Sequence, residues 1–170
     1  MNRFSLTKSC LVAAAPCMIA TAASAEVATF NFVFDTYLSE VRWGILNSAG
    51  TSTIAYSAPT GPMYVGSSLL LNSPTIVQGN SASSSSSFSY TFDVQLDLPA
   101  GNYIMVLIDT YGDGWTWGGV SGGVSFADDA VGDPILMTGG NQISGSFTVV
   151  PAPASLALLG LAGLSRRRRS

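Results

Sequence analysis

The chain has no histidine and only two cysteines, Cys10 and Cys17, which both lie near its amino terminus. Without an imidazole there is no histidine base to activate a serine or cysteine nucleophile, and zinc sites built on histidine are excluded. Everything after residue 17 lacks cysteine, so disulfides cannot hold the rest of the chain together. The fold must depend on its hydrophobic core.

Positive charge is equally scarce in the central part of the chain. Residues 26–150 contain ten acidic side chains and one basic side chain, Arg42, which gives a formal charge of −9. This balance argues against nucleic acid and anionic membrane surfaces as partners. It suits a protein that binds cations.

The first 25 residues have the features of a secretory signal peptide. Arg3 and Lys8 precede an apolar run, and Ala23-Ser24-Ala25 supplies the small-x-small pattern at which signal peptidase cleaves. We therefore expect residues 1–25 to be removed during export. The expected domains are then the signal at 1–25, one folded domain at 26–149 and a separate segment at 150–170.

The carboxyl-terminal segment joins a Val-Pro-x-Pro motif to a short apolar run, Ala154 to Leu164, and a cluster of arginines. As a transmembrane helix, roughly twelve to sixteen apolar residues of this segment at about 1.5 Å each would reach roughly 18 to 24 Å, short of the ~30 Å hydrocarbon core. The positive-inside rule would leave the arginines in the cytoplasm and the rest of the protein outside. A buried core helix is the alternative, but four arginines at a chain end argue against it.

This layout resembles the PEP-CTERM sorting signal of exported Gram-negative proteins, although Ala152 stands where the signal usually has glutamate. The resemblance implies recognition by an exosortase-like membrane protease after signal peptidase has acted. It also implies delivery to the cell surface, outer envelope or extracellular matrix. The residues that carry the resemblance are Val150, Pro151, Pro153, Arg166, Arg167, Arg168 and Arg169.

Between the two ends the chain is typical of an all-β protein. Apolar residues recur at every second position, and Gly, Asn, Pro and Ser interrupt the pattern every 8 to 15 residues. Residues 67–88, which include a run of serines, are expected to form a flexible loop. An antiparallel β-sandwich or jelly roll is the predicted fold. The expected strands are Val27 to Phe34, Glu40 to Leu46, Ser52 to Ser57, Ser89 to Leu96, Tyr103 to Ile108, Gly122 to Phe126 and Ile143 to Val150.

Two similar stretches, FDTYLSEVRW and IDTYGDGWTW, each place an acidic loop after an apolar strand. The first contains Asp35 and Glu40, and the second contains Asp109 and Asp113 between glycines. If the strands Glu40 to Leu46 and Tyr103 to Ile108 pair, all four carboxylates meet at one rim. Carboxylate oxygens in a flexible loop suit Ca²⁺. The alternative is that the aspartates only cap their own turns.

The same positions resemble a module of secreted proteins, including domains attached to extracellular proteases. The resemblance implies a CUB-like β-sandwich, some members of which hold Ca²⁺ at one acidic edge. Leu38 stands where the module usually has proline, and the module's cysteines are absent. The matching residues are Asp35, Tyr37, Ser39, Glu40, Trp43, Ile45, Pro99, Gly101, Tyr103, Asp109, Tyr111, Gly112, Asp113 and Gly114.

The tryptophans have two interpretations. Trp43 alternates with Val41 and Ile45 and is expected in the core. Trp115 and Trp117 share one face of an extended segment, where they would either stack on a ligand such as a sugar or pack over the sandwich edge.

Two classes of function fit these features. The first is an exported, non-catalytic binding or structural module, stabilised by Ca²⁺ and contributing to adhesion, contact with extracellular polysaccharide, or biofilm structure. The alternative is a small glycan-acting enzyme that uses paired carboxylates. The scarcity of basic side chains and the absence of a nucleophile beside a base favour the first.

Overall fold

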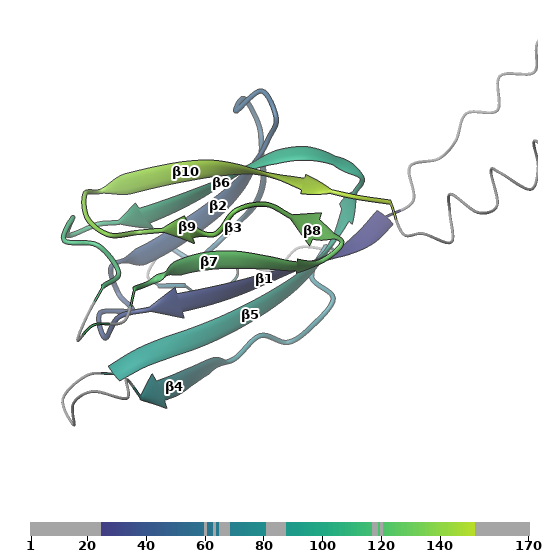
Figure 1. The fold of residues 1–170 in the computed structure, drawn as a ribbon. Helices are drawn as coiled ribbons and strands as arrows, with labels where there is room; N and C mark the ends of the chain where they lie inside the picture. The colour runs from purple at the N-terminus through teal and green to yellow at the C-terminus, as the bar shows by residue number, and fades with distance from the viewer. Residues whose placement is uncertain are drawn as a thin grey trace, which may run out of the picture.

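The computed structural model describes residues 25–59, 61, 62, 64, 69–80, 88–116, 119 and 121–151. Within these ranges the chain is all β, with two antiparallel sheets of five strands each (Figure 1). The strands are β1 (Ala25–Phe34), β2 (Val41–Asn47), β3 (Thr53–Tyr56), β4 (Ile76–Asn80), β5 (Phe88–Pro99), β6 (Gly101–Asp109), β7 (Gly123–Asp128), β8 (Ala130–Val131), β9 (Ile135–Leu136) and β10 (Gln142–Val149).

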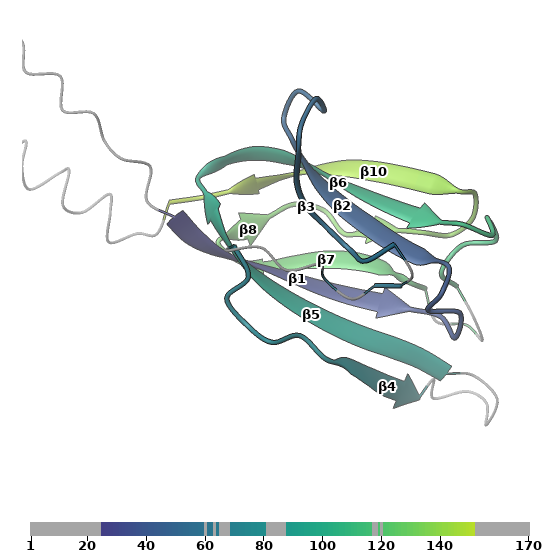
Figure 2. The same cartoon turned by 180° about the vertical axis from the view of Figure 1, so that it is seen from behind.

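Sheet A has the strand order β4-β5-β1-β7-β9, and sheet B has the order β3-β2-β6-β10-β8. Each sheet therefore has a long central strand, β1 in sheet A and β6 in sheet B. The two sheets lie one above the other (Figures 1 and 2). A β-sandwich is thus the architecture, as the alternation of apolar residues predicts.

The core is built from the inward-facing alternate positions of both sheets. Phe30, Phe32 and Phe34 of β1 are fully buried, and Trp43 of β2 stacks on Phe32 with ring centroids 5.0 Å apart. Met105 and Leu107 of β6 fill the same layer. Close packing of large rings supplies the stability that disulfides cannot.

The seven strands expected from the sequence are all present, with ends shifted by at most a few residues. Three further strands, β4, β8 and β9, were not expected. β4 lies inside the segment 67–88 that was expected to be a loop, and Leu70 forms a bridge with Leu96 of β5. That part of the prediction is corrected, while residues 81–87 lie outside the described ranges.

Both ends of the described chain lie at one end of the sandwich. Ala25 pairs with Pro99, and Val149 pairs with Gly101, so β1 begins where β10 finishes (Figure 1). No helix within the described ranges is long and apolar enough to cross a membrane. The expected signal peptide and nearly all of the expected sorting segment lie outside those ranges.

Candidate functional site

The two acidic loops lie side by side because their strands pair. β2 and β6 are antiparallel neighbours, and Val41 stands opposite Asp109 in the register. Just beyond the ladder, the Thr110 N–H donates to the Glu40 carbonyl oxygen at 3.0 Å. The pairing that would bring the carboxylates together is therefore present, at the end of the sandwich opposite the chain ends.

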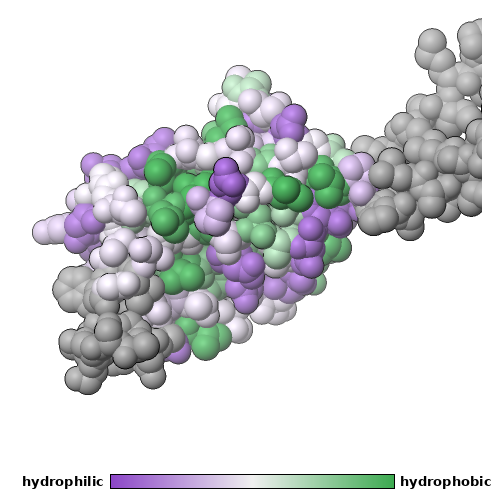
Figure 3. Space-filling model, viewed as in Figure 1, coloured by the Kyte–Doolittle hydropathy of each residue, from purple (hydrophilic) through white to green (hydrophobic). Residues whose placement is uncertain are grey.

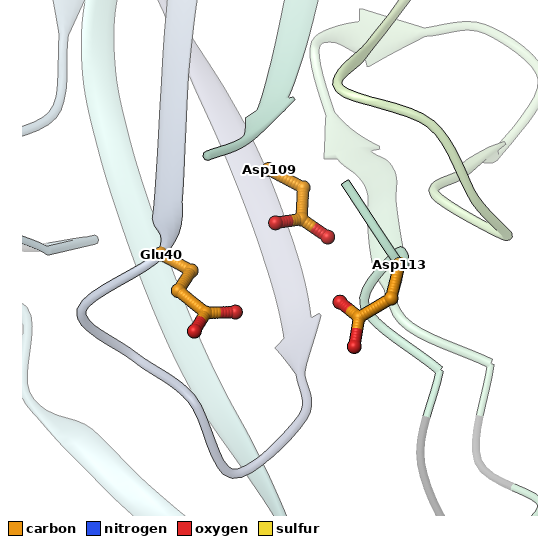
Figure 4. Close-up of side chains that lie close together, drawn as sticks. All are labelled: Glu40, Asp109 and Asp113. Atoms are coloured by element: carbon orange, nitrogen blue, oxygen red, sulfur yellow. The ribbon is translucent and has the colours of Figure 1, made fainter. Parts of the chain in front are cut away.

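Three carboxylates converge there. Glu40, Asp109 and Asp113 each offer an oxygen, and these oxygens all lie within 4.8 Å of one another. Figure 4 shows the three side chains facing one another from separate parts of the rim. Asp109 is buried, Glu40 is half-buried and Asp113 is exposed. The cluster is therefore partly open to solvent.

Asp35 lies behind this group. Its side chain is 5 % exposed, and burial raises the pKa of its carboxyl, an effect that the Tyr37 N–H offsets in part. The charges of Asp113 and Asp109 raise this pKa further. Asp35 therefore belongs to the same electrostatic group, although its oxygens are not among the three that converge. We call Asp35, Glu40, Asp109 and Asp113 the acidic rim.

Glu40 is affected by the same repulsion. Partial desolvation raises the pKa of its carboxyl, and the charges of Asp109, Asp113 and Asp35 raise it further. Like charges held together disfavour ionisation, and a bound cation would relieve that penalty.

Asp109 also organises its own loop. One of its carboxylate oxygens accepts from the N–H groups of Tyr111 and Gly112 at 2.8 and 3.0 Å, and the other accepts from the Gly114 N–H at 2.6 Å. Asp35 accepts from the Tyr37 N–H at 2.8 Å in the same way. The repeated Asp-Thr-Tyr element is thus a turn capped by its aspartate, as the alternative interpretation expected.

The glycines of the second loop are required by space and conformation. Gly112 and Gly114 have φ of 95° and 92°, where other residues are strained. A Cβ at Gly114 would stand 2.6 Å from the Gly139 nitrogen. The loop is therefore pressed against the segment that leads into β10.

Sequence reasoning missed one residue that supports this loop. The Asn141 carbonyl accepts from the Asp109 N–H at 3.0 Å, and its side-chain amide donates to the Asp109 carbonyl at 3.4 Å. Asn141 follows two glycines immediately before β10 and reads as an ordinary turn residue. Nothing in its local sequence connects it to an aspartate 32 positions earlier.

The rim has the donor set of a hard cation site. Among the described residues, no hydrogen bond to the side-chain carboxylate of Glu40 or Asp113 is present, whereas three N–H donors fix the orientation of the Asp109 carboxylate. Carboxylate oxygens of this kind are the ligands that Ca²⁺ prefers. The residues present therefore fit the ion that the sequence suggested.

The tryptophans lie in the interior. Trp43 is 2 % exposed, as expected, and its indole N–H donates to the Pro62 carbonyl at 3.0 Å. Trp115 is 1 % exposed and packs edge-on against Phe34. The expectation of an exposed stacking surface at Trp115 is therefore corrected in favour of the packing alternative. Trp117 lies outside the described ranges.

A dependence of stability on pH follows from the raised pKa of Asp35. A carboxyl whose pKa is higher in the folded state stabilises the fold while it is protonated, and this contribution is lost as the pH rises through the folded pKa. Asp35→Asn keeps an oxygen for the Tyr37 N–H and removes the charge. In EDTA, we expect this variant to become more stable relative to the wild type as the pH rises from about 4, the ordinary pKa of aspartate.

Urea unfolding from pH 4 to pH 7 measures this difference. A constant difference for Asp35→Asn would contradict the prediction.

Comparison of the chain with protein-family models, with curated proteins and with solved structures found no match. The fold and the acidic rim are therefore the basis for any proposed function.

Proposed function

We propose that this protein is an exported, non-catalytic β-sandwich module that binds Ca²⁺ at its acidic rim and serves as a binding or structural component of the cell surface or extracellular matrix. The observation that carries the proposal is the convergence of the Glu40, Asp109 and Asp113 oxygens within 4.8 Å. In a chain with so few basic groups, a cation is the available means of neutralising them.

The three residues would play different parts. Asp109, held by backbone N–H groups, is the fixed ligand, whereas Glu40 and Asp113 are free to adjust to the ion. Asp35 adds negative charge behind them. Ca²⁺ takes six to eight oxygen ligands, so water or backbone carbonyls would complete its shell. The ion would join two loops that come from different strands.

The alternative, a glycan-acting enzyme, has no comparable support. Arg42 is the only basic side chain within the described ranges, and its guanidinium donates to the Ser39 and Val41 carbonyls at 2.8 and 2.7 Å. It is therefore committed to the backbone of its own strand and the preceding loop. No described group stands ready to stabilise developing negative charge.

Calcium titration tests the metal part of the proposal. Isothermal calorimetry on EDTA-stripped protein, residues 26–151, should show one bound Ca²⁺ per chain. Glu40→Gln and Asp113→Asn should each weaken binding by about tenfold or more, because each removes a charged ligand. Absence of binding at millimolar Ca²⁺ would refute the calcium site.

The export part rests on the resemblance to signal peptides and PEP-CTERM segments. Under this proposal, signal peptidase and an exosortase-like protease act on the chain during export. Extracellular polysaccharide is the proposed partner after export. Replacing Arg166 to Arg169 with serine should abolish processing of the carboxyl-terminal segment. Immunoblotting of cell fractions measures this, with lysine at the same four positions as the control that keeps the positive charge. Unchanged processing and surface display would refute the sorting signal.

A further inference from the structure

The outer face of sheet B is apolar along its centre. Ile104, Val106 and Ile108 point outward from β6, because Tyr103, Met105 and Leu107 point into the core. Leu46 of β2 and Tyr56 of β3 lie beside them, and Tyr56 is 50 % exposed. In an antiparallel sheet with one face in solvent, the outward-facing positions are usually polar. Here the central strand presents branched aliphatic side chains at three of these positions, and the polar Asn102 lies only near its start.

A groove crosses this face. It has a volume of about 520 Å³ and is lined by Gly44, Leu46, Tyr56, Val106, Ile108 and Gln142, among others. The β2–β3 hairpin rises beyond the sheet at one end (Figure 2), and a Cβ at Gly50 in that hairpin would lie 3.8 Å from the Ile104 Cδ1 atom. The hairpin therefore bounds the groove on that side.

Gly44 forms the floor of the groove for no local structural reason. Its φ is not positive, and a Cβ there would make only ordinary contacts, 3.6 Å from the Ala55 oxygen. Glycine inside a strand costs about 0.5 to 1 kcal/mol relative to alanine and often marks the close approach of another molecule. The missing side chain leaves a hollow beside the projecting ring of Tyr56.

Negative charge is absent from this face. The outward positions of β2, β3, β6 and β10 hold no carboxylate, although residues 26–150 carry ten. Sheet A differs, since Asp93 and Asp97 point outward from β5. The β8–β9 side also exposes apolar side chains, Val131, Leu136 and Ile143, and Figure 3 shows apolar patches on the face in view. The groove on the β8–β9 side includes Asp133.

We propose that the outer face of sheet B is a self-association surface on which a second copy of this chain docks face to face. Two copies of residues 26–150, each with a formal charge of −9, repel each other, and this face brings no carboxylates together. A two-fold interface needs a projection and a hollow on the same surface, which Tyr56 and the groove above Gly44 supply. Aliphatic side chains in the centre suit a protein partner better than a sugar, because sugars stack on exposed aromatic rings and Tyr56 is the single exposed ring among the residues that line the groove.

The area of the face is sufficient for a weak dimer. The five strands of sheet B hold 30 residues, and at about 4.8 Å by 3.4 Å for each residue they give roughly 490 Å² per copy. Two copies would bury about 1,000 Å², at the lower limit for a specific interface. The dimer should therefore dissociate on dilution. It should tighten as salt is added, because salt screens the overall repulsion.

Sedimentation equilibrium of residues 26–151 tests the proposal. This segment contains the whole hydrophobic core, from Ala28 to Val149. The experiment is run in EDTA, so that its result does not depend on calcium binding. Over roughly 1 µM to 1 mM, the range expected for a small interface, the mass should rise from one copy to two.

Two variants locate the interface. Val106→Glu should raise the dissociation constant by about tenfold or more, because a carboxylate would be buried without a partner. Gly44→Gln should raise it similarly by filling the groove, with no loss of melting temperature. Val33→Glu is the matched control, since Val33 points outward from β1, the central strand of sheet A, and should leave the dissociation constant unchanged.

Three results would overturn the proposal. One is a single-copy mass at every concentration. Another is a dimer that Val33→Glu disrupts and the two sheet B variants do not. The third is a monomer that migrates more slowly in a native gel containing dextran, when Gly44→Gln abolishes this retardation. That result would show that the groove binds polysaccharide rather than a second copy.

Discussion

Asp109→Ala should lower the free energy of unfolding by about 3 kcal/mol or more. The change removes three hydrogen bonds from backbone N–H groups to one carboxylate and leaves the buried Gly114 N–H without its acceptor. Loss of the cap also releases a loop that Asn141 holds from the other side. Urea unfolding in EDTA, followed by the fluorescence of buried Trp43 and Trp115, measures the loss.

Asp113→Ala is the matched control, because it removes an aspartate from the same loop. The Asp113 side chain is exposed and accepts no hydrogen bond from any other described residue. Its replacement should change stability by less than about 0.5 kcal/mol, with relief of repulsion favouring a small gain. Asp109→Asn should fall between the two, since its amide oxygen can still accept from one side. Equal losses for Asp109→Ala and Asp113→Ala would contradict the capping role.

Added Ca²⁺ should raise the melting temperature of residues 26–151 by roughly 8 to 14 °C at a concentration 100-fold above its dissociation constant. A ligand that binds only the folded state contributes about 2.7 kcal/mol at that ratio, and each kcal/mol is worth about 3 to 5 °C for a domain of this size. Scanning calorimetry in EDTA and then in Ca²⁺ measures the shift.

Glu40→Gln and Asp113→Asn should affect the calcium response and the calcium-free stability differently. Each should reduce or abolish the shift caused by Ca²⁺, and neither should melt below the wild type in EDTA, because each removes part of the repulsion at the rim. Asp133→Asn, which changes an exposed aspartate of the β8–β9 connection, should retain the full shift. Binding at the rim would be refuted if Ca²⁺ left the melting temperature of the wild type unchanged, or if it raised the melting temperatures of both variants as much as that of the wild type.

The longer strands could be predicted because each one has a buried face and an open face. In β6, for example, Tyr103, Met105 and Leu107 alternate with less buried residues, and the sequence shows that period directly. β4 could not be predicted in this way. It lies at the edge of sheet A, where Val77 is 57 % exposed, and it pairs only with β5. An edge strand with little burial leaves no clear periodic pattern.

The convergence of the acidic loops could be predicted because strand ends determine it. Pairing of β2 with β6 places Glu40 beside Asp109, and the short loop through Gly112 and Gly114 turns Asp113 back toward them. The different parts played by the two aspartates could not be predicted. They depend on contacts with Asn141 and Gly139, which are brought to the loop by the pairing of β10 with β6.

The burial of Trp115 depended on contacts of the same long-range kind. The backbone N–H of Trp115 donates to the Met137 carbonyl at 2.7 Å, and a Cβ at Gly122 would stand 2.0 Å from the Trp115 backbone oxygen. The indole therefore enters the core only because a later glycine makes room for its backbone. A local pattern of two tryptophans among glycines resembles an exposed surface, since the covering segment lies elsewhere in the chain.

The positions of the two chain ends have a mechanical consequence. When the chain is held at its carboxyl end and a load is applied at the acidic rim, the force runs along β10 and β6. Hydrogen bonds between antiparallel strands lie across that direction, so the load is shared among all of them and must shear the ladder rather than unzip it. The nine residues of β6 give the sandwich a length of about 30 Å. It would thus transmit tension from the end where β10 finishes to the end that carries the acidic rim.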